Sequence, residues 1–258
     1  MEFTRRTGLQ LGVAALAGIA AVRFMPYEAH AQAMTGDSYD ADGGKITINP
    51  VSHASFVMTV PGMVIYNDPV GAASAYEGQP APDVILITHE HPDHFNVETL
   101  QALAGEGTRV VTNPSVYEKL PEALKAKATQ VANGEQTKIG EMSIDAVPAY
   151  NTTEERLKYH PKGRDNGYVL GVAGKRIYIA GDTEDIPEMR ALKDIFIAFV
   201  PMNLPFTMDV DQAASAVAEF KPTYVYPYHY KGSDPAAFAE NVSKEGADTK
   251  VVMGPWYS

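Results

Sequence analysis

The segment 89–94 reads His-Glu-His-Pro-Asp-His, so three imidazoles and one carboxylate fall within six residues. An apolar run at 84–87 precedes it and is typical of a buried strand. Pro92 disfavours a continuing helix, so the cluster is expected where a strand ends and a loop begins. Crowded nitrogen and oxygen donors need a shared positive partner, and neutral imidazole and carboxylate are ligands of Zn²⁺. The segment therefore predicts a metal site.

Two later residues offer donors of the same kind. Asp182 follows Gly181 after an expected strand, and His229 follows another strand between Tyr228 and Tyr230. Taken alone, Asp182 fits an ordinary Gly-Asp turn and His229 fits a buried core histidine. Sites on layered α/β folds are built at strand ends, so together with the 89–94 cluster both residues are expected to complete one site.

The elements that must position these groups alternate along the chain. The hydrophobic pattern predicts strands followed by helices, with early hairpins, which favours layered sheets with helices outside. Asn96 and Asp209 are expected to cap helices. The expected strands are 45–49, 55–60, 63–66, 84–88, 110–111, 142–147, 167–172, 176–180, 195–200, 223–226 and 250–253, and the expected helices are 97–104, 115–120, 209–220 and 235–241.

The order His-x-His-x-Asp-His, a later Gly-Asp-Thr and a late Tyr-His resembles the metallo-β-lactamase superfamily, in its metal-dependent hydrolase branch rather than its antibiotic-degrading branch. The resemblance covers roughly residues 45–253. It implies an α/β fold, a single-domain four-layer αββα sandwich with a two-metal site between the sheets. It also implies ligand roles: His89 and His91 on the first metal, Asp93, His94 and His229 on the second, and Asp182 bridging.

One ligand departs from this pattern. The family usually supplies a third histidine to the first metal just after the strand that precedes Asp182, and here the run 147–150 leads into Asn151 instead. A neutral amide oxygen is a poor ligand for Zn²⁺ and suits harder ions. The next candidate is His160, nine residues on, which a folded-back loop could bring to the same metal. Both residues remain candidates for completing the first metal site.

Other polar residues near the motifs are candidates for binding substrate. Lys162 and Arg164 could bind an anionic group, and Tyr228 could donate a hydrogen bond to an oxyanion. His53 precedes an apolar strand and is interpreted as a supporting residue rather than a ligand.

The expected chemistry follows from the metals. Two cations lower the pKa of a shared water to roughly 7 and give a hydroxide nucleophile. Two Zn²⁺ ions are expected, with Mn²⁺ or Fe²⁺ as alternatives, and Asp93 or Asp182 would steer the proton. The favoured function is hydrolysis of an ester, lactone or phosphodiester. An iron-dependent oxidoreductase and a non-catalytic metal or ligand binder are the alternatives.

Composition and net charge limit the classes of molecule that the protein is expected to bind. The 258-residue chain has a formal net charge of −11 and no Lys/Arg cluster beyond its N-terminus, which argues against nucleic acid. It has no cysteine, which excludes thiolate metal sites and disulfides. A small-molecule substrate is expected, and the sequence does not define an oligomeric state.

The first residues read as an export signal. Arg5-Arg6 precedes an Ala/Gly/Leu run at 11–22, and small-x-small cleavage sites end at Ala31 and Ala33. This pattern resembles a twin-arginine signal peptide over residues 1–31. It predicts a periplasmic or secreted protein with no stable membrane anchor after processing. Residues 32–44 are expected to be a flexible lead-in to a hydrolase domain at 45–258.

Overall fold

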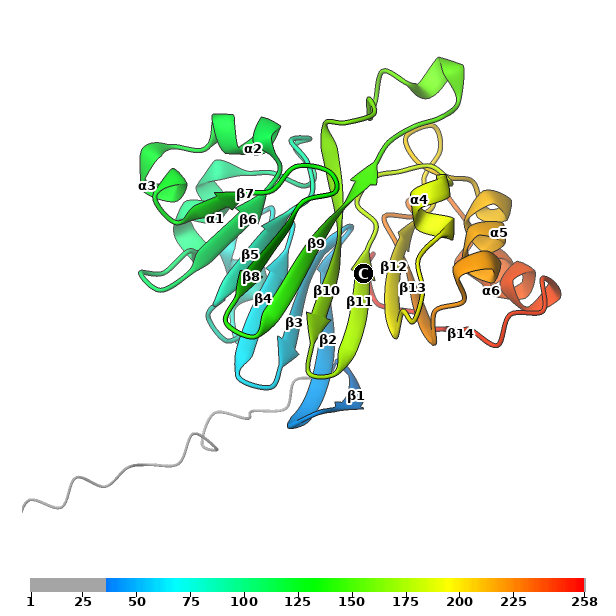
Figure 1. Ribbon diagram of the computed structural model, residues 1–258, viewed down its shortest axis with the longest axis horizontal. Coiled ribbons are helices and arrows are strands. Elements are labelled where there is room, and N and C mark those ends of the chain that lie inside the picture. Colours follow the sequence, from blue (N-terminus) through cyan, green and yellow to red (C-terminus); the bar gives the residue numbers. More distant parts are fainter. Residues whose placement is uncertain (1–35, 258) are drawn as a thin grey trace, which may run out of the picture. The chain divides into compact units, whose positions relative to one another are not determined.

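The structure is a computed structural model that describes residues 36–257, and within them the strands form two seven-stranded sheets (Figure 1). The first sheet contains β1 (Asp37–Ala41), β2 (Gly44–Ser52), β3 (Ser55–Val60), β4 (Met63–Asn67), β5 (Val84–Ile87), β6 (Arg109–Thr112) and β7 (Ala128–Gln130). The second contains β8 (Gln136–Ile139), β9 (Met142–Ala149), β10 (Asp165–Val172), β11 (Lys175–Ile179), β12 (Ile197–Pro201), β13 (Tyr224–Tyr228) and β14 (Lys250–Val251).

Both sheets keep their strands in chain order, so the two consecutive halves of the domain build one sheet each. In the first sheet β1 to β4 pair antiparallel and β4 to β7 pair parallel. The second repeats this plan, with β8 to β11 antiparallel and β11 to β14 parallel. Parallel strands end at the same sheet edge, so the loops after them can meet there.

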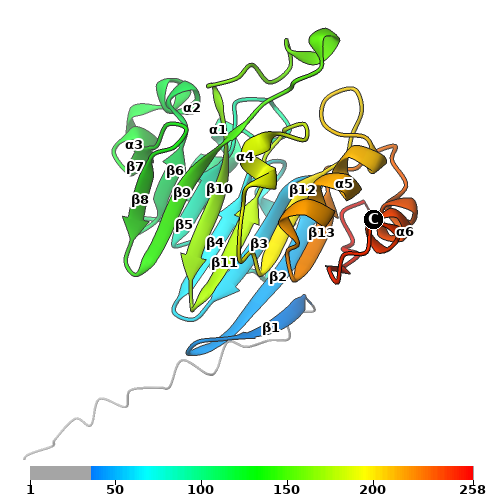
Figure 2. The same cartoon turned by 45° about the vertical axis from the view of Figure 1, so that its right-hand side comes forward.

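The sheets pack face to face, and helices cover their outer faces (Figure 2). The inner core joins side chains of both sheets, such as Phe56 and Phe199, whose rings stack at 4.1 Å. The first sheet packs on α1 (Val97–Leu103), α2 (Pro114–Lys119) and α3 (Glu122–Lys125). The second packs on α4 (Pro187–Arg190), α5 (Val210–Phe220) and α6 (Pro235–Lys244). This confirms the predicted single-domain αββα sandwich.

The predicted helix caps are confirmed. The Asn96 side chain accepts a hydrogen bond from the backbone N–H of Thr99 at 2.9 Å, at the start of α1. Asp209 begins α5 with a capping box. Its side chain accepts a hydrogen bond from the Gln212 backbone N–H, and the Gln212 side chain accepts one from the Asp209 backbone N–H. These caps satisfy backbone donors at the helix starts.

The flexible lead-in predicted for 32–44 is wrong from residue 37 onward. Residues 37–41 form β1, which pairs with β2 across the turn at Asp42-Gly43. Tyr39 anchors this strand, because its ring packs against Tyr224 and Phe196. The predicted signal peptide lies outside the described residues. Within residues 36–257 no helix has the length and apolar character needed to cross a membrane.

Candidate metal centre

The predicted donors converge at the edge where parallel strands end. The 89–94 segment follows β5, Asp182 follows β11, and His229 follows β13 directly. Gly181 allows the approach of Asp182, because it adopts φ +66° and a Cβ there would lie 2.6 Å from the Asn166 backbone oxygen. The donors form two neighbouring groups: His89, His91, His160 and Asp182 in the first, and His53, Asp93, His94 and His229 in the second.

The first group takes two residues from each half of the chain: His89 and His91 from the first half, and His160 and Asp182 from the second. His89 Nε2 and His160 Nε2 lie 3.1 and 3.2 Å from His91 Nδ1. The same two atoms lie 3.7 and 3.4 Å from Asp182 Oδ2. His160 therefore lies with the predicted ligands of the first metal, because its loop folds back toward them.

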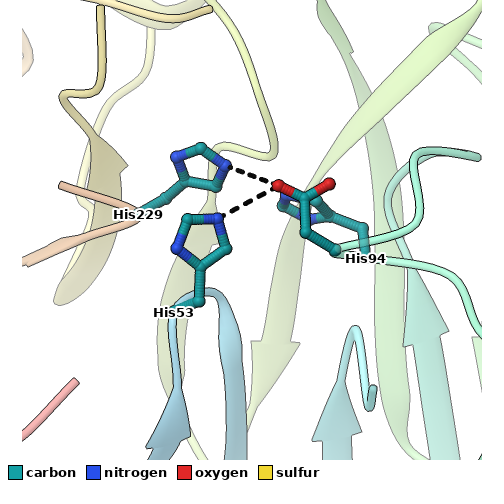
Figure 3. Close-up of side chains that lie close together, drawn as sticks. His53, His94 and His229 are labelled. Atoms are coloured by element: carbon teal, nitrogen blue, oxygen red, sulfur yellow. Dashed lines mark hydrogen bonds and ion pairs between the residues drawn. The ribbon is translucent and has the colours of Figure 1, made fainter. Parts of the chain in front are cut away.

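The second group centres on Asp93. His229 Nε2 lies 3.4 Å from Asp93 Oδ2, and the His53 imidazole faces the same oxygen (Figure 3). Asp182 lies between the two groups, since its Oδ2 is 3.2 Å from His229 Nε2 and its Oδ1 is 3.3 Å from His94 Nε2. This position fits the bridging role that the resemblance implies.

The spacing of these donors fits divalent metal ions. Two donors that each lie about 2.0–2.1 Å from a tetrahedral Zn²⁺ are roughly 3.3 Å apart, close to the separations within each group. Among the described residues, His94 Nε2, Asp182 Oδ1 and His229 Nε2 are buried and make no hydrogen bond. Buried polar atoms without partners are costly, so a shared cation accounts for their arrangement.

Hydrogen bonds behind the imidazoles fix which nitrogen faces the site. His160 Nδ1 donates to Asn151 Oδ1 at 2.7 Å, so its Nε2 can present a lone pair to the first group. His89 Nδ1 lies 3.0 Å from Thr88 Oγ1, whose own proton goes to Asp68 Oδ2 at 2.6 Å. His89 Nδ1 must therefore donate, which leaves its Nε2 free as well.

Asn151 lies behind His160 instead of beside the metal ligands. Its Oδ1 also accepts from the His160 backbone N–H at 3.0 Å, and its Nδ2 donates to the Phe206 carbonyl at 2.8 Å. Both of its side-chain polar atoms are thus committed, so its prediction as a direct ligand is wrong in this structure. Asn151 closes the loop that carries His160, as the Asn151 N–H bond to the His160 carbonyl at 2.8 Å also shows.

Asp68 is a supporting residue that sequence reasoning missed. Its Oδ2 accepts from His94 Nδ1 at 2.8 Å, and its Oδ1 accepts from the Thr88 backbone N–H at 2.7 Å. A carboxylate behind a ligating imidazole sets its tautomer and orientation. The sequence did contain a signal, because the acidic residue in Asn67-Asp68-Pro69 follows the expected strand 63–66.

The electrostatics differ between the imidazoles. Burial lowers the pKa of His91 to about 4 and lowers the pKa of His89 well below its ordinary value. Burial opposes protonation of His94 too, but Asp182 and Asp68 outweigh it and raise the pKa of His94 to about 9. His89 and His91 are thus held neutral, whereas His94 must release a proton to bind a metal.

The three residues predicted to contact substrate lie in different surroundings, and only Arg164 is seen to contact a donor residue. Arg164 forms a bidentate pair with Asp165 at 2.7 and 2.8 Å, and its Nη2 lies 3.4 Å from His91 Nε2. Lys162 contacts the Tyr150 hydroxyl and Glu188 at 3.1 and 3.4 Å. Tyr228 has no exposed surface and packs in the inner core, which contradicts its predicted contact with a substrate.

This fold and donor set define a metal-binding protein of the metallo-β-lactamase type. The chain belongs to the beta-lactamase superfamily domain family, whose profile matches residues 47–229, and within it to the UPF0173 metal-dependent hydrolases. A UPF0173 metal-dependent hydrolase from Pyrococcus furiosus is 34% identical over 181 residues, which cover 66% of this chain and 77% of that protein. One from Nanoarchaeum equitans is 29% identical over 217 residues, covering 80% and 95%.

Solved structures agree with this assignment. The crystal structure of a putative metal-dependent hydrolase from Parabacteroides distasonis has a TM-score of 0.76 and 43% identity, and the match covers 84% of this chain and 97% of that one. The metallo hydrolase Igni18 from Ignicoccus hospitalis has a TM-score of 0.67 and 24% identity, covering 81% and 95%, and supports the fold alone.

Proposed function

We propose that the protein is a hydrolase that uses metal-activated water on a carboxylic ester or lactone, with Zn²⁺ as the expected metal. The observation that carries this is the pair of adjoining donor groups with Asp182 between them. Bound divalent ions would lower the pKa of water toward 7 and polarise the carbonyl oxygen of the substrate.

The two predicted catalytic carboxylates differ in solvent exposure, and we assign them different roles for this reason. Asp182 is 2% exposed, so it is suited to holding the metals together. Asp93 is 49% exposed, so its carboxylate can meet both water and substrate. We assign to Asp93 the transfer of the proton from the attacking water to the leaving group.

The surroundings of the site favour an uncharged substrate over a phosphodiester. The two cations that were predicted to bind an anionic substrate are already paired, Arg164 with Asp165 and Lys162 with Glu188. Exposed apolar side chains instead lie on the two loops next to the site, Leu157 on one and Leu204 and Phe206 on the other. The Phe206 carbonyl touches both Asn151 Nδ2 and His160 Nδ1, which places this loop against the first donor group.

A substrate panel tests this proposal. With the Zn²⁺-loaded enzyme, kcat/KM for p-nitrophenyl esters should rise with acyl length, by at most about fourfold per buried methylene. Bis(p-nitrophenyl) phosphate should be a poorer substrate than these esters. Phe206→Ser should flatten the dependence on chain length, whereas Phe206→Leu, which keeps an apolar side chain, should preserve it. A preference for the phosphodiester would contradict the ester assignment.

Metal analysis separates hydrolysis from the other two functions. A hydrolase should contain about two Zn²⁺ per chain and turn over esters without a redox partner. Tightly bound iron with ester turnover absent would favour an oxidoreductase. Full metal occupancy without any turnover of the panel would favour a binding protein.

We also propose that the protein is exported by the twin-arginine route and released into the periplasm or beyond. Arg5-Arg6 with the small-x-small sites at Ala31 and Ala33 supports this. Replacing both arginines with lysine should leave the full-length precursor in the cytoplasm, as fractionation and immunoblotting would show. Unimpaired export of that double variant would contradict this route.

A further inference from the structure

His53 joins the metal donors from a separate hairpin. Every histidine in residues 36–257 lies in this site: His53, His89, His91, His94, His160 and His229. His53 Nε2 lies 3.1 Å from Asp93 Oδ2, and its ring centroid lies 3.8 Å from that of His229. Figure 3 shows both imidazoles directed at one carboxylate oxygen. The distances from His53 Nε2 and His229 Nε2 to Asp93 Oδ2, 3.1 and 3.4 Å, match the roughly 3.3 Å between donors around a single tetrahedral ion.

The backbone is built to hold His53 in this place. His53 adopts φ 54°, in a left-handed region that few residues other than glycine occupy. Its carbonyl accepts from the His229 N–H at 3.0 Å, and its N–H donates to the Trp256 carbonyl at 3.2 Å. The hairpin between β2 and β3 is thereby tied to the loop after β13, which fixes His53 next to His229.

The other ring nitrogen of His53 has a supporting oxygen. His53 Nδ1 lies 2.6 Å from the Tyr257 hydroxyl, which also accepts from the Lys231 backbone N–H at 3.1 Å. The same plan holds for three neighbouring imidazoles, each with Nε2 toward the donors and Nδ1 on an oxygen: His89 on Thr88, His94 on Asp68 and His160 on Asn151. Ligating histidines commonly use their second nitrogen in this way.

We propose that His53 binds the second metal ion through Nε2 and that Tyr257 is its positioning residue. The second group then supplies three imidazoles and the Asp93 carboxylate, a set suited to Zn²⁺ or another divalent transition metal. Both groups would then have four protein side chains, with Asp182 counted in the first. This assignment rests on the metal binding of the proposed function and not on its reaction.

The test measures metal binding by the full chain. Zn²⁺ affinity is determined by chelator competition, and Co²⁺-loaded protein is compared by its visible absorption spectrum. His53→Ala should weaken one of the two ions by about 10-fold to 100-fold or more and change the Co²⁺ spectrum. Tyr257→Phe should weaken the same ion less. Tyr230→Phe is the matched control and should change neither, since Tyr230 contacts the Tyr257 ring but not His53 Nδ1.

The possible results distinguish the assignment of His53 as a ligand from the proposed reaction. If His53→Ala and Tyr257→Phe bind both ions within twofold of the unaltered protein, His53 is not a ligand. If His53→Ala fails to fold, His53→Gln and Tyr257→Phe decide by the same two measurements. If the unaltered protein binds no divalent metal, the proposed function fails together with this assignment. Loss of metal in a protein that hydrolyses none of the panel would support His53 and contradict only the reaction.

Discussion

Asp182→Ala should lose at least one metal ion, and its kcat/KM should fall by more than about a hundredfold, because residues behind ligands already cost 10-fold to 100-fold. Asp182 faces His89 and His160 with one oxygen and His94 with the other. Without its carboxylate two cations would repel each other in a buried site. Elemental analysis of the dialysed protein and ester turnover measure the two effects.

Asp185→Ala is the matched control for this experiment. Asp185 lies three residues from Asp182 and pairs with Arg190, away from the donor groups. This variant should keep both ions and its turnover. Two retained ions with near-normal turnover in Asp182→Ala would disprove the bridging role.

His160→Ala should lower the metal content by about one ion. His160 Nε2 lies 3.2 Å from His91 Nδ1 within the first group, so its removal leaves that group with three donors. Asn151→Ala should keep the stoichiometry at saturating metal and weaken one ion by about 10-fold to 100-fold, because Asn151 only orients His160. Chelator competition on both variants measures the ranking.

The reverse ranking would make Asn151 the ligand, and Asn151→His would then tighten Zn²⁺ binding. Unchanged stoichiometry and affinity in both alanine variants would mean that neither residue completes the first group. That outcome would favour an enzyme with a single metal ion. The comparison therefore also tests the number of ions that the proposed function requires.

The sequence predicted the donors well where chemistry is local. The 89–94 run places four donors within one loop, and ligand-type residues at the ends of expected strands pointed to Asp182 and His229. Asn151 and His160 could not be ranked, because the choice depends on a loop that folds back through a contact with Phe206. His53 was set aside for the same reason: its role depends on a hairpin meeting the loop of the opposite sheet.

Buried strands and capped helices were predicted because their hydrophobic patterns are strong. The short edge strands β1, β7 and β8 escaped notice, since they are mostly polar and gain their order from one neighbour. The prediction for Tyr228 was wrong because its position next to His229 in the sequence does not show which face of the sheet its side chain points to. Successive strand residues point to opposite faces, and Tyr228 points into the inner core.

Because each half of the domain forms one sheet, metal ions bound between them would also link the two halves. Each donor group combines side chains from both halves, such as His91 with His160, which lie 69 positions apart. An ion that joins such residues is a cross-link in a protein without cysteine. By the loop-entropy argument used for disulfides, one link of this length restricts the unfolded chain by about 4 kcal/mol. Removal of the ions by chelation should therefore lower the free energy of unfolding of the whole domain.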